Sequence, residues 1–305
     1  MQFSDQLVLL KQPGLNTNDD KRVVNYLQQI SYYRLSAYFL PYQLQKDKFN
    51  NDISFDHILD TYLFDRDLRL LVFDTIERIE VAIRTQFVYT MAMTYNNSHW
   101  HDDKSLFKPP YKNYQGYYVD PYNDFQKIIS KAIDTKNPEV FIKHYINKYD
   151  SPKNPPSWMS IELLTVGELS RIYNGLAKNS DKQKIADFFG LHRNTFKSWL
   201  HSHTYVRNIC AHHSRLWNRE FAIRPEILKK PKFPWIDSIY NNNGRIFYFL
   251  CTVQYLLNRA NPQNSLRIKL NTLFNKYPTV PIRFIGLPSD KDGKIADWDS
   301  QPIWK

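Results

Sequence analysis

The stretch from Ser54 to about Tyr95 constrains the fold more than any other part of the sequence. Apolar residues recur through it at intervals of three and four positions, from Ile58 to Phe87. That spacing gathers them on one face of a helix. The stretch therefore predicts two consecutive long helices that share a buried face.

The rest of the chain also favours helices. Only eight glycines occur among 305 residues, which disfavours phosphate-cradling loops and many tight hairpins. Periodicity and helix-ending residues predict further helices over 20–40, 138–149, 157–176, 180–189, 193–219, 245–260 and 265–277. We therefore expect an all-α fold.

Three segments follow from this pattern. Residues 1–53 form an N-terminal helical segment, and residues 54–277 form the main helical domain. Residues 96–119 lack periodicity and are rich in polar residues, which predicts an exposed loop or a loop-rich insertion between helical layers. Residues 278–305 form an irregular C-terminal tail.

Charge and cysteine content limit the function classes. The 41 basic and 30 acidic residues leave a net charge of +11, which favours an anionic partner such as nucleic acid. Two cysteines are too few for a disulfide framework or a thiolate zinc site. No cofactor is implied. The first residues lack a signal-like leader, and residues 246–257 are too short and interrupted to span a bilayer. We expect a cytoplasmic protein without a membrane partner.

The segment YVRNICAHHSRLWNR, residues 205–219, carries the chemistry of interest. If one long helix covers residues 193–219, side chains spaced by four, three and four positions share a face. This predicted polar stripe consists of Asn208, His212, Arg215 and Arg219. Arg207 lies one position off the stripe but has the reach to turn towards His212, whereas His213 points to another side.

These residue types suit RNA cleavage without a metal or cofactor. The 2′-hydroxyl attacks its own phosphate once a group moves protons and another stabilises charge on the phosphoryl oxygens. Histidine is a general acid or base near neutral pH, and arginine neutralises a developing oxyanion. Arg207, Asn208 and His212 are thus the candidate catalytic residues, with Asn208 orienting His212. An ordinary solvated helix face is the alternative.

The motif also resembles a known family. Arg207 to His212 is similar to the R-x(4–6)-H signature of HEPN ribonucleases, and RNICAHHSRLWNR resembles the Abi-like abortive-infection family of the AbiD/AbiF type. The segments ISYYRLSAYFLPYQ, FDRDLRLLVFDTIERIEVAIRTQ and PSWMSIELLTVGELSRIY resemble the same family in the same order. The resemblance implies an all-α HEPN bundle and an endoribonuclease toxin of phage defence. It also implies a homodimer with a composite, metal-independent site, and a small-RNA or protein antitoxin as partner.

Two further groups of residues enter as secondary candidates. In HEPN proteins a polar position on an earlier helix often faces the motif, and Glu77, Glu80 and Arg84 share one face here. A surface salt-bridge ladder that includes Glu80 and Arg84 is the alternative. His213, Arg215 and Arg219 are secondary candidates within the motif itself. Residues 32–34 are expected to pack in the core.

Two other function classes stay open. Residues 184–200, KIADFFGLHRNTFKSWL, resemble a helix-turn-helix, which would make the protein a DNA-binding regulator. The residues that would then read base edges are His192, Arg193, Asn194 and Lys197. A capped helical corner is the alternative interpretation of that segment. A non-catalytic RNA-binding module is the third class.

Overall fold

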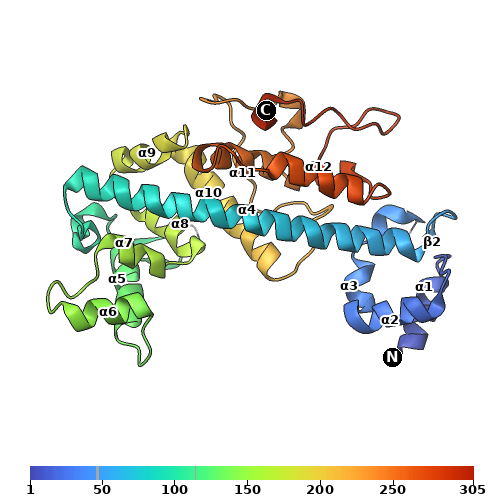
Figure 1. Cartoon of the computed structure of the whole chain (residues 1–305), viewed down its shortest axis with the longest axis horizontal. Helices are drawn as coiled ribbons and strands as arrows, with labels where there is room; N and C mark the ends of the chain where they lie inside the picture. The colour runs from blue at the N-terminus through green and yellow to red at the C-terminus, as the bar shows by residue number, and fades with distance from the viewer. Residues whose placement is uncertain (46–47, 114) are drawn as a thin grey trace. The chain divides into compact units, whose positions relative to one another are not determined.

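The computed structural model describes residues 1–45, 48–113 and 115–305. This part of the chain forms twelve α-helices and two small antiparallel sheets, which confirms the all-α prediction (Figure 1). The helices are α1 (Phe3–Lys11), α2 (Asp20–Ile30), α3 (Tyr32–Ser36), α4 (Phe55–Tyr95), α5 (Pro121–Ile133), α6 (Val140–Lys148), α7 (Ser157–Ser160), α8 (Val166–Gly175), α9 (Asn179–Phe188), α10 (Arg193–Ala211), α11 (Ile246–Ala260) and α12 (Leu266–Lys276). The sheets pair β1 (Gln43–Gln45) with β2 (Lys48–Phe49), and β3 (Tyr111–Lys112) with β4 (Tyr118–Val119).

The chain divides into two compact units, each built from separate stretches of sequence. Unit 1 comprises residues 1–73, 209–219 and 265–296, and unit 2 comprises residues 74–208, 220–264 and 297–305. Helices α4 and α10 each contribute residues to both units. The sequence predicted three consecutive segments, 1–53, 54–277 and 278–305, whereas each unit combines separate stretches of the chain. The division into those three segments stays a prediction.

Helix α4 is one uninterrupted helix, so the prediction of two consecutive helices is wrong. No glycine or proline occurs between Phe55 and Tyr95, and nothing else interrupts its backbone hydrogen bonds. Its buried side chains recur along the whole length at helical spacing, for example Phe64, Leu68 and Val72 in unit 1. This long helix supplies core residues to both units.

The predicted helix over residues 20–40 is divided in two at Ser31. Ser31 has a φ of +70°, which is incompatible with a continuing right-handed helix, and its hydroxyl accepts a hydrogen bond from the Arg34 N–H that begins α3. The break also changes the exposure of residues 32–34. Tyr32 packs edge-on against Phe39, but Tyr33 is 88% exposed. The expectation that all of residues 32–34 pack in the core is therefore wrong.

The core of unit 2 forms around α11. Residues 246–257 are buried on every face of this helix, the pattern of a helix enclosed by others. Trp199 of α10 meets Tyr255 edge-on, and the C-terminal Trp304 lies against Phe247. Aromatic side chains thus pack α10 and the C-terminal residues against α11. The helices predicted over 245–260 and 265–277 are confirmed, since α11 and α12 occupy those positions.

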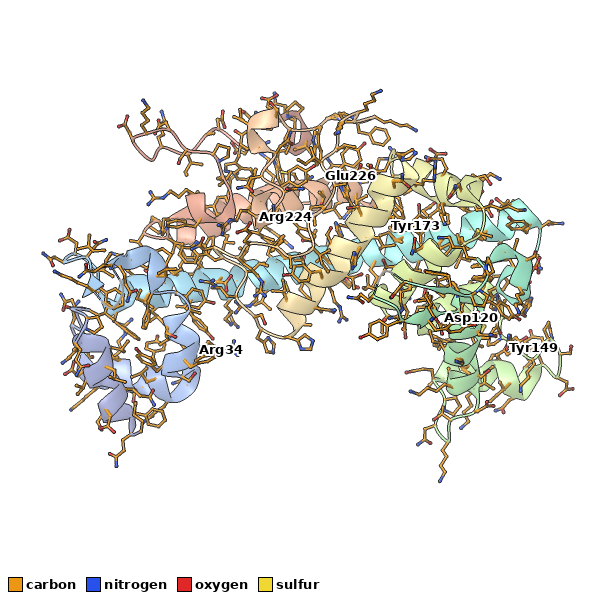
Figure 2. The ribbon with its side chains drawn as sticks, turned by 180° about the vertical axis from the view of Figure 1, so that it is seen from behind. Arg34, Asp120, Tyr149, Tyr173, Arg224 and Glu226 are labelled. Atoms are coloured by element: carbon orange, nitrogen blue, oxygen red, sulfur yellow. The ribbon has the colours of Figure 1, made fainter. Side chains whose placement is uncertain are left out.

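Other predicted helices have different bounds. A 3-10 turn and an extended Leu164 separate α7 from α8 within 157–176, because the Thr165 hydroxyl caps a new helix there. Helix α9 begins at Asn179, one residue before the predicted start. Helix α5 was not predicted, although Asp120 caps it and Pro121 occupies its first position (Figure 2).

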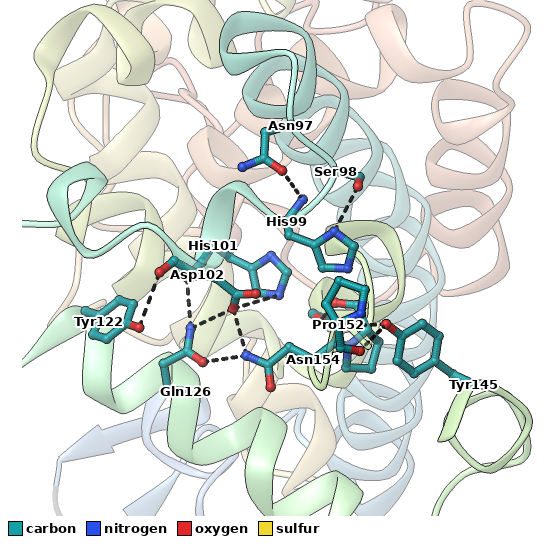
Figure 3. A network of polar contacts seen from close by, with 12 residues as sticks. Asn97, Ser98, His99, His101, Asp102, Tyr122, Gln126, Tyr145, Pro152 and Asn154 are labelled. Atoms are coloured by element: carbon teal, nitrogen blue, oxygen red, sulfur yellow. Dashed lines mark hydrogen bonds and ion pairs between the residues drawn. The ribbon is translucent and has the colours of Figure 1, made fainter. Parts of the chain in front are cut away.

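The insertion predicted to be exposed is anchored in unit 2 through His101. Trp100 and His101 are fully buried, and burial lowers the pKa of His101 to about 4, so its imidazole is neutral at pH 7. The neighbouring Asp102 carboxylate accepts a 2.7 Å hydrogen bond from the Asn154 amide, and Gln126 of α5 donates to the His101 carbonyl (Figure 3). This network joins the insertion to α5 and to the chain before α7. Of the two alternatives for this stretch, the exposed loop is wrong for Trp100 and His101, because both are buried.

Candidate functional site

Helix α10 ends inside the motif, at Ala211. The Ser214 N–H donates to the Ile209 carbonyl and the His213 N–H donates to the Cys210 carbonyl, while His213 has a φ of +55°. Together these features form a Schellman cap, with His213 at the left-handed position that glycine usually occupies. His212 is therefore the residue at the helix terminus, and the chain changes direction directly after it.

This cap corrects the predicted polar stripe. The stripe requires a helix as far as residue 219, but Arg215 and Arg219 follow the helix end. The Arg215 guanidinium donates to the Ala37 carbonyl, and the Arg219 guanidinium donates to the Arg215 carbonyl at 3.1 Å. Both therefore brace local backbone in unit 1. The prediction that His213 points to another side assumed a regular helix, and His213 lies beyond the end of the helix with a φ of +55°.

A buried carboxylate holds the segment that follows His212. Asp65 of α4 is fully buried and accepts hydrogen bonds from the backbone N–H groups of Leu216 at 3.0 Å and Trp217 at 2.6 Å. The Tyr38 hydroxyl donates to it at 2.6 Å, and Arg69 forms an ion pair with it. Burial raises the pKa of Asp65, and these four donors oppose that rise by stabilising its charged form.

Aromatic packing and a second arginine complete this support within unit 1. Trp217 is fully buried and stacks on Tyr38 and Tyr42. Arg34 of α3, seen in Figure 2, donates to the His213 carbonyl at 2.8 Å. That bond fastens the backbone directly after the end of the helix to α3. His212 and His213 are exposed, and the segment that follows them is held by buried, well-packed residues.

Asp65, Arg69, Tyr38 and Arg34 were missed as supports of the motif. The sequence holds one signal for Asp65: it is an acidic residue next to Phe64 on an apolar helix, with Arg69 four positions later. A charged pair at that spacing is most often on the surface. Only the structure shows that Asp65 reaches backbone 151 residues away in sequence.

Burial separates the histidines and cysteines near the motif into structural and exposed groups. His203 of α10 is buried against Phe249, and burial lowers its pKa to about 3, so it stays neutral in the core. Burial raises the pKa of Cys210 to about 12, which removes it as a thiolate nucleophile at neutral pH. His212 is exposed. His213 is exposed as well, but it occupies the left-handed position of the cap, whereas His212 is the residue at the helix terminus.

The predicted catalytic residues are divided between the two units, because the chain passes from unit 2 to unit 1 after Asn208. Arg207 and Asn208 belong to unit 2, in the last turn of α10, where Arg207 is half-buried and Asn208 is exposed. His212 belongs to unit 1. An exposed imidazole can move a proton, and a guanidinium can stabilise a phosphoryl oxyanion. These are the groups that transesterification of RNA requires.

Glu80 and Arg84 have a structural role in unit 2. Arg84 is buried and donates to the Ile161 carbonyl at 2.5 Å and the Leu164 carbonyl at 2.6 Å. Its guanidinium also pairs with Glu80, but this pair is largely buried and is not the surface salt-bridge ladder that the alternative described. Glu77 is exposed. Arg84 thus fastens the chain between α7 and α8.

The segment resembling a helix-turn-helix forms a capped corner between α9 and α10. The Gln183 amide donates to the Leu191 carbonyl, and its oxygen accepts from the Arg193 N–H at 3.0 Å. Tyr173 of α8, labelled in Figure 2, donates to the Lys182 and Arg193 carbonyls beneath this corner. His192, Asn194 and Lys197 are exposed, and Arg193 is half-buried.

In the described ranges, no group of three or more histidine, cysteine, aspartate or glutamate side chains could hold a metal ion. In the same ranges, no helix combines the length and apolar character needed to cross a bilayer.

Comparison with known proteins identifies the family. The family model for Abi-like protein matches residues 25–218, which include the supports Arg34, Tyr38 and Asp65 and the motif at 207–212. Searches of curated proteins and of solved structures found no match. The matched stretch covers well over half of the sequence, and the chain belongs to the Abi-like protein family.

Proposed function

We propose that this protein is a metal-independent, HEPN-type endoribonuclease that acts as a toxin in abortive infection. Family membership suggests abortive infection as the setting. One observation carries the chemical proposal: Arg207 and Asn208 occupy the last turn of α10, and the exposed His212 follows at its cap on a buried polar support. Such a support keeps a reactive side chain in a defined position.

The reaction follows from the groups available. The 2′-oxygen of a ribose attacks the adjacent phosphorus, the bond from phosphorus to the 5′-oxygen breaks, and the 5′-oxygen receives a proton. His212 moves a proton as general acid or base, and Arg207 stabilises the phosphoryl oxygens. Asn208 orients the imidazole. The products are a 2′,3′-cyclic phosphate and a 5′-hydroxyl.

We propose a homodimer as the active form, because one motif supplies only half of the polar groups of a paired site, and symmetric dimers are the commonest assembly. RNA is the substrate, and a small RNA or a protein is the proposed antitoxin. A non-catalytic RNA-binding module would share the binding surface but leave RNA intact.

The direct test is to incubate purified protein with total RNA in EDTA and to sequence the new ends. We expect cleavage in the chelator and 2′,3′-cyclic phosphate termini. Loss of cleavage in EDTA, with rescue by magnesium or manganese, would contradict the proposed mechanism. Intact RNA that nevertheless binds the protein would favour the non-catalytic module.

A further inference from the structure

A large groove lies within unit 2. Its volume is about 940 Å³, near the upper end of the roughly 300–1,000 Å³ of small-ligand sites. Residues from β3, β4, α5, α8 and α10 line it. Most of these side chains are polar or charged, unlike those of an apolar ligand pocket. The groove is therefore suited to an extended polar ligand.

Three cations and two acids line the groove, and two of the three cations have no acidic partner among the described residues. Lys112, Arg171 and Lys197 line it, together with His201. The acid Glu168 accepts a 2.7 Å hydrogen bond from the Thr165 N–H at the start of α8 and forms an ion pair with Arg171 at 3.8 Å. The second acid, Asp124, is exposed. Among the described residues, no carboxylate pairs with Lys112 or Lys197. These two cations are available to an anionic ligand.

A buried lysine that interacts with the groove residue Lys197 adds further positive charge. Lys182 is only 7% exposed, and no ion pair joins it to an acidic side chain in the described part of the chain. Burial lowers its pKa to about 8, and Lys108 and the groove residue Lys197 add to that shift by repulsion. Positive charge is thus concentrated beside the groove, where a phosphate would relieve the repulsion.

Other lining groups suit nucleobases. Tyr111 offers a partly exposed ring on which a base can stack. The side-chain amides of Asn174 and Asn194 have no side-chain hydrogen-bond partner among the described residues, and each offers both a donor and an acceptor. Cations for phosphates, a ring for stacking and amides for base edges are the features of single-strand binding sites.

One face of α10 connects the groove to the candidate motif. Successive residues turn by about 100°, so four exposed side chains lie within roughly 60° of one another on this helix. They are Asn194, Lys197, His201 and Asn208. His201 and Asn208 are seven residues apart, about 10 Å along the axis. All four belong to unit 2.

We propose that this groove binds a single strand of RNA and guides it along α10 towards Arg207 and Asn208. The inference rests on the proposed function in taking RNA as the substrate. It assigns Lys112, Lys197 and His201 to substrate positioning. Duplex DNA is disfavoured, since a major-groove reader needs a projecting helix, whereas Asn194 and Lys197 form the wall of a hollow.

The test uses full-length protein carrying His212→Ala, so that bound RNA stays intact. Fluorescence anisotropy measures its affinity for a short labelled single-stranded RNA and for the same sequence as a duplex. The groove variant adds Lys112→Glu and Lys197→Glu. The matched control adds Lys136→Glu and Lys143→Glu, the same charge change at exposed lysines outside the groove. Thermal melting verifies that every variant is folded.

We expect the groove variant to lose at least about tenfold in affinity at about 0.1 M salt. The slope of log K against log salt concentration should become shallower by about 1.4, the contribution of two phosphate contacts to a single strand. The control should stay within about twofold, and the duplex should bind at least about tenfold more weakly than the single strand. Equal loss in both variants, no loss in the groove variant, or equal binding of the duplex would overturn the proposal.

The failure of this proposal is distinguishable from that of the proposed function. If the parent protein cleaves RNA but the groove variant binds normally, the groove assignment is wrong and the nuclease assignment stands. If the parent leaves RNA intact but the groove variant alone loses binding, the groove assignment stands and the nuclease assignment fails.

Discussion

At the scale of single residues, His213 adopts a backbone conformation that side chains other than glycine seldom take. Its φ of +55° completes the cap of α10. We predict that His213→Gly preserves the cap and raises the stability by up to about 1 kcal/mol, because glycine adopts this conformation without the clash of a Cβ atom. Thermal unfolding measures the change. A loss of stability of similar size would show that the imidazole itself makes a stabilising contact.

Asp65 should matter for activity although we assign it no role in the chemistry. Asp65→Asn leaves Arg69 without its ionic partner in a buried site and weakens the hydrogen bonds from Leu216 and Trp217. Removing one member of a buried pair costs about 3–5 kcal/mol. We therefore predict a large decrease in the free energy of unfolding, measured with urea, and RNA cleavage reduced about tenfold or more as His212 loses its support.

The matched control is Asp56→Asn, the same chemical change in an exposed pair with Arg22. Exposed pairs contribute about 1 kcal/mol at most. If both variants lost stability equally, the special role of Asp65 would be wrong.

At the scale of elements, His203 lies between α10 and α11, and its burial there makes the free energy of unfolding depend on pH. The pKa of His203 is about 3 in the fold, below its value of about 6.5 in an unfolded chain. The unfolded chain therefore takes up a proton as the pH falls below about 6.5, while the folded chain does not. The free energy of unfolding decreases progressively from about pH 6.5 down to about pH 3 as a result. At pH 5 this amounts to about 2 kcal/mol.

His203→Gln keeps a partner for the Thr252 hydroxyl but cannot become charged. We predict that this variant loses less stability between pH 7 and pH 5 than the parent, as measured by urea unfolding at both values. Identical losses in the two proteins would show that His203 does not contribute to the acid dependence.

The elements were predictable where local signals acted alone. α11 and α12 followed from apolar periodicity and from Asn261 and Pro262, which end α11. The breaks at Ser31 and Thr165 were missed because a hydroxyl cap inside an apolar pattern competes with helix continuation, and the pattern does not reveal which wins. The single helix α4 was predicted as two helices because its length exceeds that of most helices, although no residue in it breaks the pattern.

The candidate site was predictable in its residue types but not in its support. Arg207, Asn208 and His212 came from spacing and resemblance, and the structure places them at the end of α10. The sequence could not show the cap at His213, since a histidine replaces the glycine that usually marks one. Nor could it show Asp65, because the bonds to Leu216 and Trp217 depend on tertiary packing.

At the scale of the whole molecule, the proposed composite site predicts that activity depends on assembly. We expect a homodimer by light scattering and a steep loss of specific activity on dilution below the dissociation constant of the dimer. A protein that remains monomeric at every concentration and still cleaves RNA at nanomolar concentration would show that one chain suffices.

The central claim concerns the motif at the end of α10. Its most direct test compares the parent with His212→Ala and with the Arg207→Ala/His212→Ala double variant, using circular dichroism, melting temperature and cleavage of the same RNA in EDTA. We predict folded variants whose cleavage rates fall at least about a hundredfold, since each loses a proton-transfer group and the double variant also loses the charge-stabilising guanidinium. A well-folded double variant that cleaves RNA at the rate of the parent would contradict the account.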